Sequence, residues 1–375
     1  MIKGSEFSAV RLGRRDVLHA AAAAALGMPL IGTRAFGQDK LSGSGEVVVF
    51  SYGGSYTKAM RKNVYEPFTK ATGIAVVDVT ADSAEPQVKA MKQGGRVDWD
   101  VAVIDVQYFN PMREAGMFVP IDYSIWDDES LKGVPQEARF SDGVVAYQNA
   151  VVLVYDERAF PSGGPKDWVD FWNLKAFPGP RGLAAKPTHL TFPLVADGVP
   201  ESQIWPLTDD KLDRAFRKLD EIKPNVAKWW SAGGEPIQAL LNKEFAVTTC
   251  FDGRAVQAIR HGASLRIVWN QGQIGGSYYT ILRGGPNSGN AQKFLAYVNR
   301  AQIAANYTLE TNLVSPNSNQ LQHLPANIIP LLSINPENKS QLTPLDGAWL
   351  SSRRTDGKTN FEHVQERWLA WRAQG

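Results

Sequence analysis

The side chains best suited to bind a small charged molecule lie in the run Phe251-Asp252-Gly253-Arg254. The carboxylate of Asp252 can pair with an ammonium group, and the guanidinium of Arg254 can hold a carboxylate through two parallel hydrogen bonds. The run follows the alternating segment "FAVTTCF", a pattern typical of a strand. Loops after strands commonly carry binding residues, so we expect both charges to face a ligand. The alternative is an Asp that caps a turn beside a surface Arg.

Five aromatic residues stand at the ends of predicted strands or helices. They are Tyr52, Tyr108, Trp229, Phe251 and Tyr278. The face of an aromatic ring attracts a cation and contributes about 0.5–2 kcal/mol in doing so. Any one of these rings would more commonly belong to a hydrophobic core. Their shared position at element ends nevertheless predicts that they wall a site for an amine.

The sequence offers no set of residues suited to catalysis or to metal binding. The histidines are scattered, and no two of them have the i,i+4 spacing that puts a pair of ligands on one helix face. They are His19, His189, His261, His323 and His363. No G-x-S-x-G motif is present. Cys250, the only cysteine, is predicted to be a buried, unreactive thiol. We therefore expect no enzyme, no cofactor and no bound metal.

The stretch "VVVFSYGGSY" has the order strand, two glycines, helix start. A phosphate-binding loop has the same order, but Gly53-Gly54 lacks the Lys-Ser/Thr of a P-loop and the third glycine of a dinucleotide fingerprint. Glycine also permits a tight turn and the close approach of a ligand to the backbone. We expect such a turn, with Ser51 and Tyr52 lining a cleft, in place of a nucleotide site.

The elements that would position these residues alternate between strands and helices. Residues 46–52, 74–80 and 99–105 are strand-like, and residues 55–72 and 85–95 between them have helical patterns. Strands that alternate with helices indicate parallel βαβ units and an α/β fold.

The length of 375 residues suggests two domains. Residues 143–160 form a β-rich run that could cross to a second lobe. Residues 264–270 and 277–285 suggest two further strands, and the second could return to the first lobe. Each lobe would hold a mainly parallel sheet flanked by helices, with the ligand in the cleft between the lobes. The predicted division is 46–150 plus 279–325 for lobe 1 and 151–278 plus 326–375 for lobe 2.

Residues 1–37 are typical of an export signal. Arg14 and Arg15 precede an alanine-rich, weakly hydrophobic core, and Ala35 and Gly37 suit a cut before Gln38. The paired arginines favour the twin-arginine route to the periplasm. The alternative is a cytosolic protein with an alanine-rich tail. Removal of this segment would reduce the basic residues from 40 to 35 and the acidic residues from 38 to 36. The resulting charge of −1 does not suggest a nucleic-acid partner.

The chain after this segment resembles the polyamine-type periplasmic solute-binding proteins of ABC importers. The resemblance runs in order through "VYEPFTKATGIAV", "AMKQGGRVDWDVAVID", "FNPMREAGMFVPID", "DWVDFWNLKAFPG", "CFDGRA" and "SYYTILRGGPNSGNAQKFLAYV" to "ETNLVSPNS". It implies the two-lobe periplasmic binding protein fold of type II. It also implies capture of a solute in the interlobe cleft, delivery to membrane permease subunits, a monomer, and no catalytic activity.

The resemblance further implies where ligand contacts should lie. Spermidine- and putrescine-binding members place aromatic residues after the first strand, which here is Ser51-Tyr52. They place an aromatic residue with an acid or amide at the position of Phe251-Asp252. A Trp and an acid occupy the stretch that matches residues 278–280, which contains Tyr278.

Two departures from that pattern bear on the ligand. The family's acidic loop matches residues 186–191, "KPTHLT", which hold no carboxylate, and Thr280 stands where an acid would hold a second amine. Asp252 alone remains as an amine anchor. Together with Arg254 it would suit a zwitterion such as γ-aminobutyrate, while putrescine and spermidine stay open as alternatives.

Two other functions also stay open. Tyr278-Tyr279 could bind ferric iron, as in iron-binding relatives of the same fold, and a coloured protein would support this. An exported enzyme on the same scaffold is the other alternative, although the sequence offers no nucleophile–base pair.

Overall fold

The structure is a computed structural model that describes residues 39–374. The predicted export signal lies outside the described residues. The strands are β1 (Glu46–Ser51), β2 (Ala75–Thr80), β3 (Val101–Asp105), β4 (Phe118–Val119), β5 (Val144–Asp156), β6 (Arg181–Ala184), β7 (Val226–Trp230), β8 (Val247–Phe251), β9 (Leu265–Leu282) and β10 (Leu342–Pro344). The α-helices are α2 (Gly54–Met60), α3 (Glu66–Thr72), α4 (Ala84–Gln93), α5 (Val106–Glu114), α6 (Asp128–Gly133), α7 (Trp168–Trp172), α8 (Thr191–Ala196), α9 (Asp209–Ile222), α10 (Glu235–Leu241), α11 (Asp252–Arg260), α12 (Ser288–Val298), α13 (Ala301–Thr311), α14 (Pro336–Lys339), α15 (Gly347–Ser351) and α16 (Asn360–Arg372).

The tight turn predicted at Gly53-Gly54 is present just before α2. Gly53 and Gly54 have φ values of 77° and 56°, which favour glycine. A Cβ on Gly53 would lie 2.7 Å from a Thr80 methyl group. The helix predicted over residues 55–72 is present as α2, a π-helical turn at Arg61–Tyr65, and α3.

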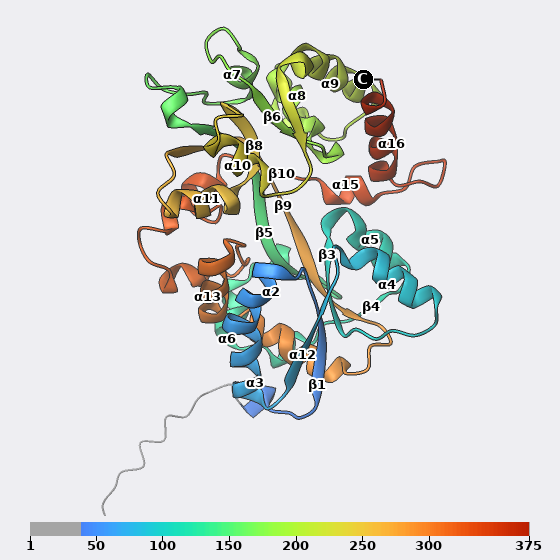
Figure 1. The fold of residues 1–375 in the computed structure, drawn as a ribbon. Coiled ribbons are helices and arrows are strands. Elements are labelled where there is room, and N and C mark those ends of the chain that lie inside the picture. The colour runs from blue at the N-terminus through green and yellow to red at the C-terminus, as the bar shows by residue number, and fades with distance from the viewer. Residues whose placement is uncertain (1–38, 375) are drawn as a thin grey trace, which may run out of the picture. The chain divides into compact units, whose positions relative to one another are not determined.

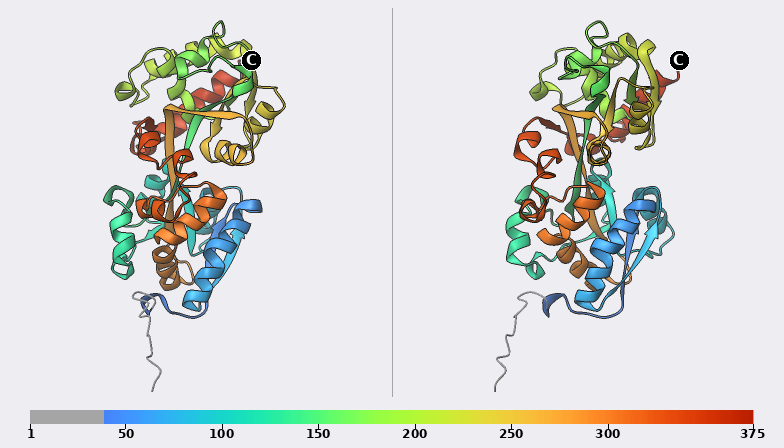
Figure 2. Two further views of the ribbon diagram at one scale, coloured as in Figure 1. Left: turned by 90° about the vertical axis from the view of Figure 1, so that its left-hand side faces the viewer. Right: turned by 60° about the vertical axis from the view of Figure 1, so that its left-hand side comes forward.

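One sheet of ten strands passes through both halves of the described chain. Its order is β2-β1-β3-β9-β5-β8-β6-β7, and β4 and β10 also pair with β9. β1 is parallel to β2 and β3, and β6 is parallel to β7 and β8. The long strands β5 and β9 are antiparallel to each other and join these parallel groups. Figures 1 and 2 show them running from the half with α2, α12 and α13 to the half with α8, α9 and α16. The predicted α/β fold with two lobes is confirmed.

Strand β9 corrects one prediction about the elements. Residues 264–270 and 277–285 were expected as separate strands, but β9 continues through 18 residues. Gln271 takes a φ of 62°, and the pairing with β5 shifts register between Val151 and Leu153. An irregular point of this kind lets a strand bend without ending, so the glycine-containing stretch remains part of the sheet.

Buried apolar side chains form separate cores in the two halves. One cluster draws on residues 41–147 and 279–307. A second draws on residues 151–247 and 364–371, and a third includes Trp230 and Cys250. Cys250 is fully buried, as predicted, and this burial raises the pKa of its thiol. Within residues 39–374 no helix is both long enough and apolar enough to cross a membrane.

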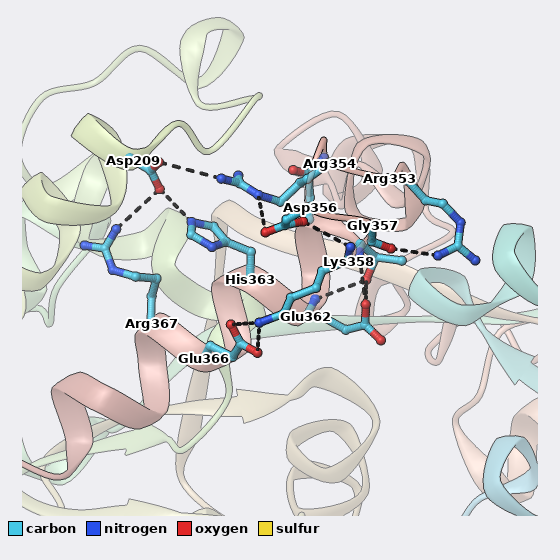
Figure 3. A network of polar contacts seen from close by, with 12 residues as sticks. Asp209, Arg353, Arg354, Asp356, Gly357, Lys358, Glu362, His363, Glu366 and Arg367 are labelled. Carbon is cyan, nitrogen blue, oxygen red and sulfur yellow. Dashed lines mark hydrogen bonds and ion pairs between the residues drawn. The ribbon is translucent and has the colours of Figure 1, made fainter.

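Polar contacts tie the C-terminal helix to the second half (Figure 3). At the start of α9, Asp209 Oδ1 lies 2.6 Å from His363 Nε2 and 3.3 Å from Arg367 Nη1. The neighbouring His363 lowers the pKa of the Asp209 carboxyl. Thr359 and Glu362 form a capping box that begins α16. These contacts place α16 against the second core.

Candidate ligand-binding cleft

Two adjoining cavities lie where strands of both halves end. We call the first, about 480 Å³, the Asp105 cavity, because Asp105, Gln273 and Ser277 line only this one. We call the second, about 660 Å³, the Asp82 cavity, because Asp82 and Glu310 line only this one. The side chains that line both are Tyr52, Tyr56, Asn149, Lys186, Phe251, Arg254 and Leu313. Tyr52, Asp105, Lys186 and Phe251 stand at or just beyond the carboxyl ends of β1, β3, β6 and β8, where ligands of parallel α/β sheets bind.

Asp105 supplies the carboxylate of the first-lobe wall. It is the last residue of β3, and its Oδ1 accepts a hydrogen bond from Ser277 Oγ at 2.7 Å. Its backbone amide donates to Glu85 Oε1 at 2.7 Å. Burial, and then the charge of Asp105, raise the pKa of Glu85. Asp105 forms no ion pair in the described part of the chain, so its charge is available to a ligand.

Tyrosines complete the first-lobe wall. Tyr147 Oη donates to Tyr52 Oη at 2.8 Å, and the Tyr52 ring packs edge-on against Tyr56 with centroids 5.1 Å apart. Burial raises the pKa of Tyr52, and the neighbouring Asp105 adds to the rise. The hydroxyls therefore remain neutral, and the rings offer apolar and π surface to a cation.

The second-lobe wall carries two cations. The pKa of Lys186 is lowered by burial, and its Nζ lies 5.0 Å from the centre of the Phe251 ring. Arg254 is exposed in the first turn of α11. Neither side chain makes an ion pair or hydrogen bond with another residue between positions 39 and 374. An enclosed cation without a partner is costly, so this wall is suited to an anionic group.

The loop after β6 holds Lys186 in place. Residues Pro187–Leu190 form a 3-10 turn between β6 and α8. From β9, Gln273 Nε2 donates to Thr188 O at 2.9 Å and to Thr191 Oγ1 at 3.0 Å. His189 also lines the Asp105 cavity. Burial, and then Lys186, lower the pKa of His189 to about 3.

Three of the residues predicted to bind the ligand meet at the shared wall of the two cavities. They are Tyr52, Phe251 and Arg254. Asp252 lines the Asp82 cavity, but its carboxylate is buried and its Oδ1 accepts the amide of Ala150 at 3.1 Å. Burial raises the pKa of Asp252 to about 6. Ser51 lines neither cavity, because it is fully buried and contacts the Thr57 hydroxyl.

The other three predicted residues do not line either cavity. Tyr108 packs against Phe361, with ring centroids 5.5 Å apart, and Phe361 in turn lines the Asp105 cavity. Trp229 packs against Trp368 and lines a small apolar cavity of about 10 Å³ that Lys186 also lines. Tyr278 stacks on Phe109 at 4.2 Å in the first core.

The tyrosine pair offered for iron does not form a metal site. Tyr278 and Tyr279 are successive residues of β9, so their side chains face opposite sides of the sheet. Tyr279 is buried among core residues near Phe294. In the described part of the chain, no group of three or more His, Cys, Asp or Glu side chains could hold a metal ion.

The sequence analysis missed Asp105, Lys186, His189 and Gln273 as cleft residues. Asp105 carries a clear signal, because it ends a predicted buried strand at the edge where ligands bind. Lys186 and His189 belong to the loop "KPTHLT". The sequence analysis considered only that this loop has no carboxylate, and not that its Lys and His could bind an anionic group. Gln273 gives no local signal, because its role comes from the pairing of β9 with distant strands.

The chain is similar in sequence and in fold to several known proteins. The gamma-aminobutyric acid-binding protein of Pseudomonas aeruginosa is 31% identical over 339 residues, which cover 88% of this chain and 92% of that protein. The spermidine/putrescine-binding periplasmic protein of Escherichia coli is 23% identical over 282 residues, which cover 70% of this chain and 76% of that protein. A solved ABC transporter structure from Rhodopseudomonas palustris is 32% identical, with a TM-score of 0.76, and covers 87% of this chain and 99% of that one. The family model for the bacterial extracellular solute-binding protein matches residues 63–327. The relatives bind solutes and are not enzymes, and the chain belongs to the family of bacterial extracellular solute-binding proteins.

Proposed function

We propose that this protein captures a small zwitterionic amine, of the γ-aminobutyrate kind, in the periplasm and delivers it to the permease subunits of an ABC importer. The observation that carries the proposal is the charge pattern of the Asp105 cavity. Asp105 lies on the first-lobe wall, and Lys186 and Arg254 lie on the second-lobe wall. A solute with an ammonium at one end and a carboxylate at the other matches both walls.

The ammonium end would lie between Asp105 and the rings of Tyr52 and Tyr56. A carboxylate beside aromatic faces stabilises an ammonium through both the ion pair and the π contacts. The buried Asp252 is a second candidate anchor, because it lines the neighbouring Asp82 cavity. Comparison of the two carboxylates by mutation decides which one the ammonium uses.

The carboxylate end would lie at Lys186 and Arg254. Pairing an enclosed cation with a carboxylate removes the cost of its burial. A diamine would instead place a second ammonium near these cations. The charge pattern therefore favours a zwitterion over putrescine or spermidine, although relatives of both kinds exist.

We propose the division into lobes given by residues 46–150 plus 279–325 and residues 151–278 plus 326–375. The separate hydrophobic cores and the two crossing strands support it. Export by the twin-arginine route with a cut near Gly37/Gln38, and action as a monomer without a nucleic-acid partner, belong to the same proposal. Closure of the lobes on the solute would exclude water from the charge pairs and strengthen them.

Calorimetric titration of the wild type with a matched panel tests the function. The panel contains γ-aminobutyrate, butyrate, butylamine, putrescine and spermidine, so each end group is tested alone and in pairs. We expect γ-aminobutyrate to bind, and butyrate and butylamine each to bind at least about 100-fold more weakly, because each loses one charge pair. Tighter binding of putrescine or spermidine than of any zwitterion would overturn the proposal.

A further inference from the structure

His189 has an unsatisfied polar atom in the wall of the cleft. The residue lines both the Asp105 cavity and the small apolar cavity that Lys186 also lines. Its Nδ1 is buried and has no hydrogen-bond partner among residues 39–374. Its ring contact is with Phe192, at 5.3 Å between centroids. Buried polar atoms without partners are rare in native proteins and call for an explanation.

The surroundings of His189 determine which nitrogen carries the proton. With a pKa of about 3, the imidazole is neutral and has one N–H. Apart from Lys186 and His189, the small cavity is lined by apolar side chains and by Trp rings, which are not acceptors. A buried N–H without an acceptor is less tolerated than a bare lone pair. The proton therefore belongs on Nε2, which leaves Nδ1 as a bare lone pair.

The loop that carries His189 is held without the help of its ring nitrogens. Gln273 binds the loop through Thr188 O and Thr191 Oγ1. The neighbouring Phe192 stacks on Trp168 with centroids 3.9 Å apart. A change of the imidazole to another side chain of similar size should leave this backbone in place.

We propose that His189 determines specificity in the carboxylate subsite, where its Nε2–H donates to the solute oxygen that pairs with Lys186. The inference rests on the proposed function and names a further residue of that site. A cation and a neutral hydrogen-bond donor side by side both favour the binding of an anion, and both disfavour an ammonium group. Lys186 and His189 together would therefore reject the second amine of a polyamine.

Two substitutions separate the donor from the ring. His189→Phe keeps the size and the aromatic ring and removes the donor, and His189→Gln keeps an N–H donor. We expect His189→Phe to weaken γ-aminobutyrate binding by about 10-fold or more and His189→Gln by about 3-fold or less. The preference for γ-aminobutyrate over putrescine should fall in His189→Phe alone. His261→Phe is a matched control, because His261 ends α11 and lines neither cavity.

If folded His189→Phe, with the melting temperature of the wild type, binds γ-aminobutyrate as tightly as the wild type, the inference is overturned and the proposed function stands. If the wild type binds no zwitterion, the proposed function is wrong, and the inference about His189 is overturned with it. Nitrogen-15 NMR of histidine-labelled protein gives a second readout, with the His189 signals identified by their loss in His189→Gln. We expect the Nε2–H form, with its N–H resonance shifted on addition of γ-aminobutyrate. The Nδ1–H form, or an unshifted resonance, contradicts the inference.

Discussion

The two walls of the cleft differ in how their polar groups are satisfied. On the first-lobe wall, Asp105 accepts a hydroxyl hydrogen bond and Tyr147 donates to Tyr52. On the second-lobe wall, Lys186 and Arg254 have no ion-pair partner within the described residues. Both walls hold charges without an ion-pair partner, but Asp105 on the first wall already accepts a hydrogen bond, whereas the two cations on the second wall donate none within the described residues and depend on the solute. Changes on the second wall should therefore cost more affinity than changes on the first.

Lys186→Met gives the largest expected effect. The variant keeps most of the apolar stem and removes the charge that would pair with the solute carboxylate. We expect γ-aminobutyrate affinity to fall by at least about 100-fold, or about 3 kcal/mol, in calorimetric titration. Lys175→Met, at an exposed lysine of the same half, should bind as the wild type does. Equal affinities for both variants would place the carboxylate elsewhere.

Asp105→Asn should have the next largest effect. Asparagine can still accept the Ser277 hydrogen bond, so the wall keeps its shape while the ammonium loses its charged partner. We expect affinity to fall by about 10- to 50-fold, measured in the same titration. Asp82→Asn, in the adjoining cavity, serves as the control and should change affinity by less than about 2-fold. A larger loss in Asp82→Asn than in Asp105→Asn would move the solute to the other cavity.

Asp252→Asn tests whether that carboxylate serves the fold or the ligand. Burial raises its folded pKa to about 6, above the ordinary value of 3.8, so the neutral form is favoured in the fold. The stability that comes from the neutral carboxyl group is fully present below about pH 4. It is lost as the pH rises through 6, because the buried group must then ionise. We expect Asp252→Asn to raise stability by about 2 kcal/mol at pH 7.5 and by less at pH 4, in thermal denaturation. A large loss of γ-aminobutyrate affinity, without this pH dependence, would instead make Asp252 the ammonium anchor.

The smallest effects should separate two tyrosines, one in the wall of the cleft and one packed against the first core. Tyr52→Phe removes the acceptor of Tyr147 at the shared wall, and we expect a loss of affinity of about 3- to 10-fold. Tyr278→Phe alters a ring stacked on Phe109 away from both cavities, and we expect affinity within about 2-fold of the wild type. Fluorescence or calorimetric titration of both variants measures the difference. The reverse order would show that the solute reaches Tyr278.

The sequence predicted the architecture better than it predicted the site. Periodic patterns and the glycine turn at Gly53-Gly54 are local, and they gave the α/β order and the turn correctly. The joining of two predicted strands into β9 depends on pairing with β5, which no local pattern contains. Tyr278 was predicted as a wall residue because it stands at the end of a predicted strand. That position does not say which face of the sheet the side chain occupies, since the faces are set by pairing with distant strands.

The charged residues show a second limit of the sequence. Asp252 and Arg254 are close in the chain and were assigned together, yet the carboxylate is buried against Ala150 while the guanidinium is exposed. Asp105 and Lys186 are 81 positions apart, and only the fold brings them to one cavity. The opposed charges that carry the proposed function could therefore not be found by reading motifs one at a time.

The ratio of γ-aminobutyrate to putrescine affinity in Lys186→Glu tests the central claim most directly. The substitution gives the second-lobe wall a carboxylate in place of the cation, so both ends of the cleft then offer an acid. If the wild type prefers γ-aminobutyrate because of the opposed charges, the ratio should invert, and putrescine should bind more tightly than γ-aminobutyrate. A ratio equal to that of the wild type, in a variant with an unchanged melting temperature, would contradict the account.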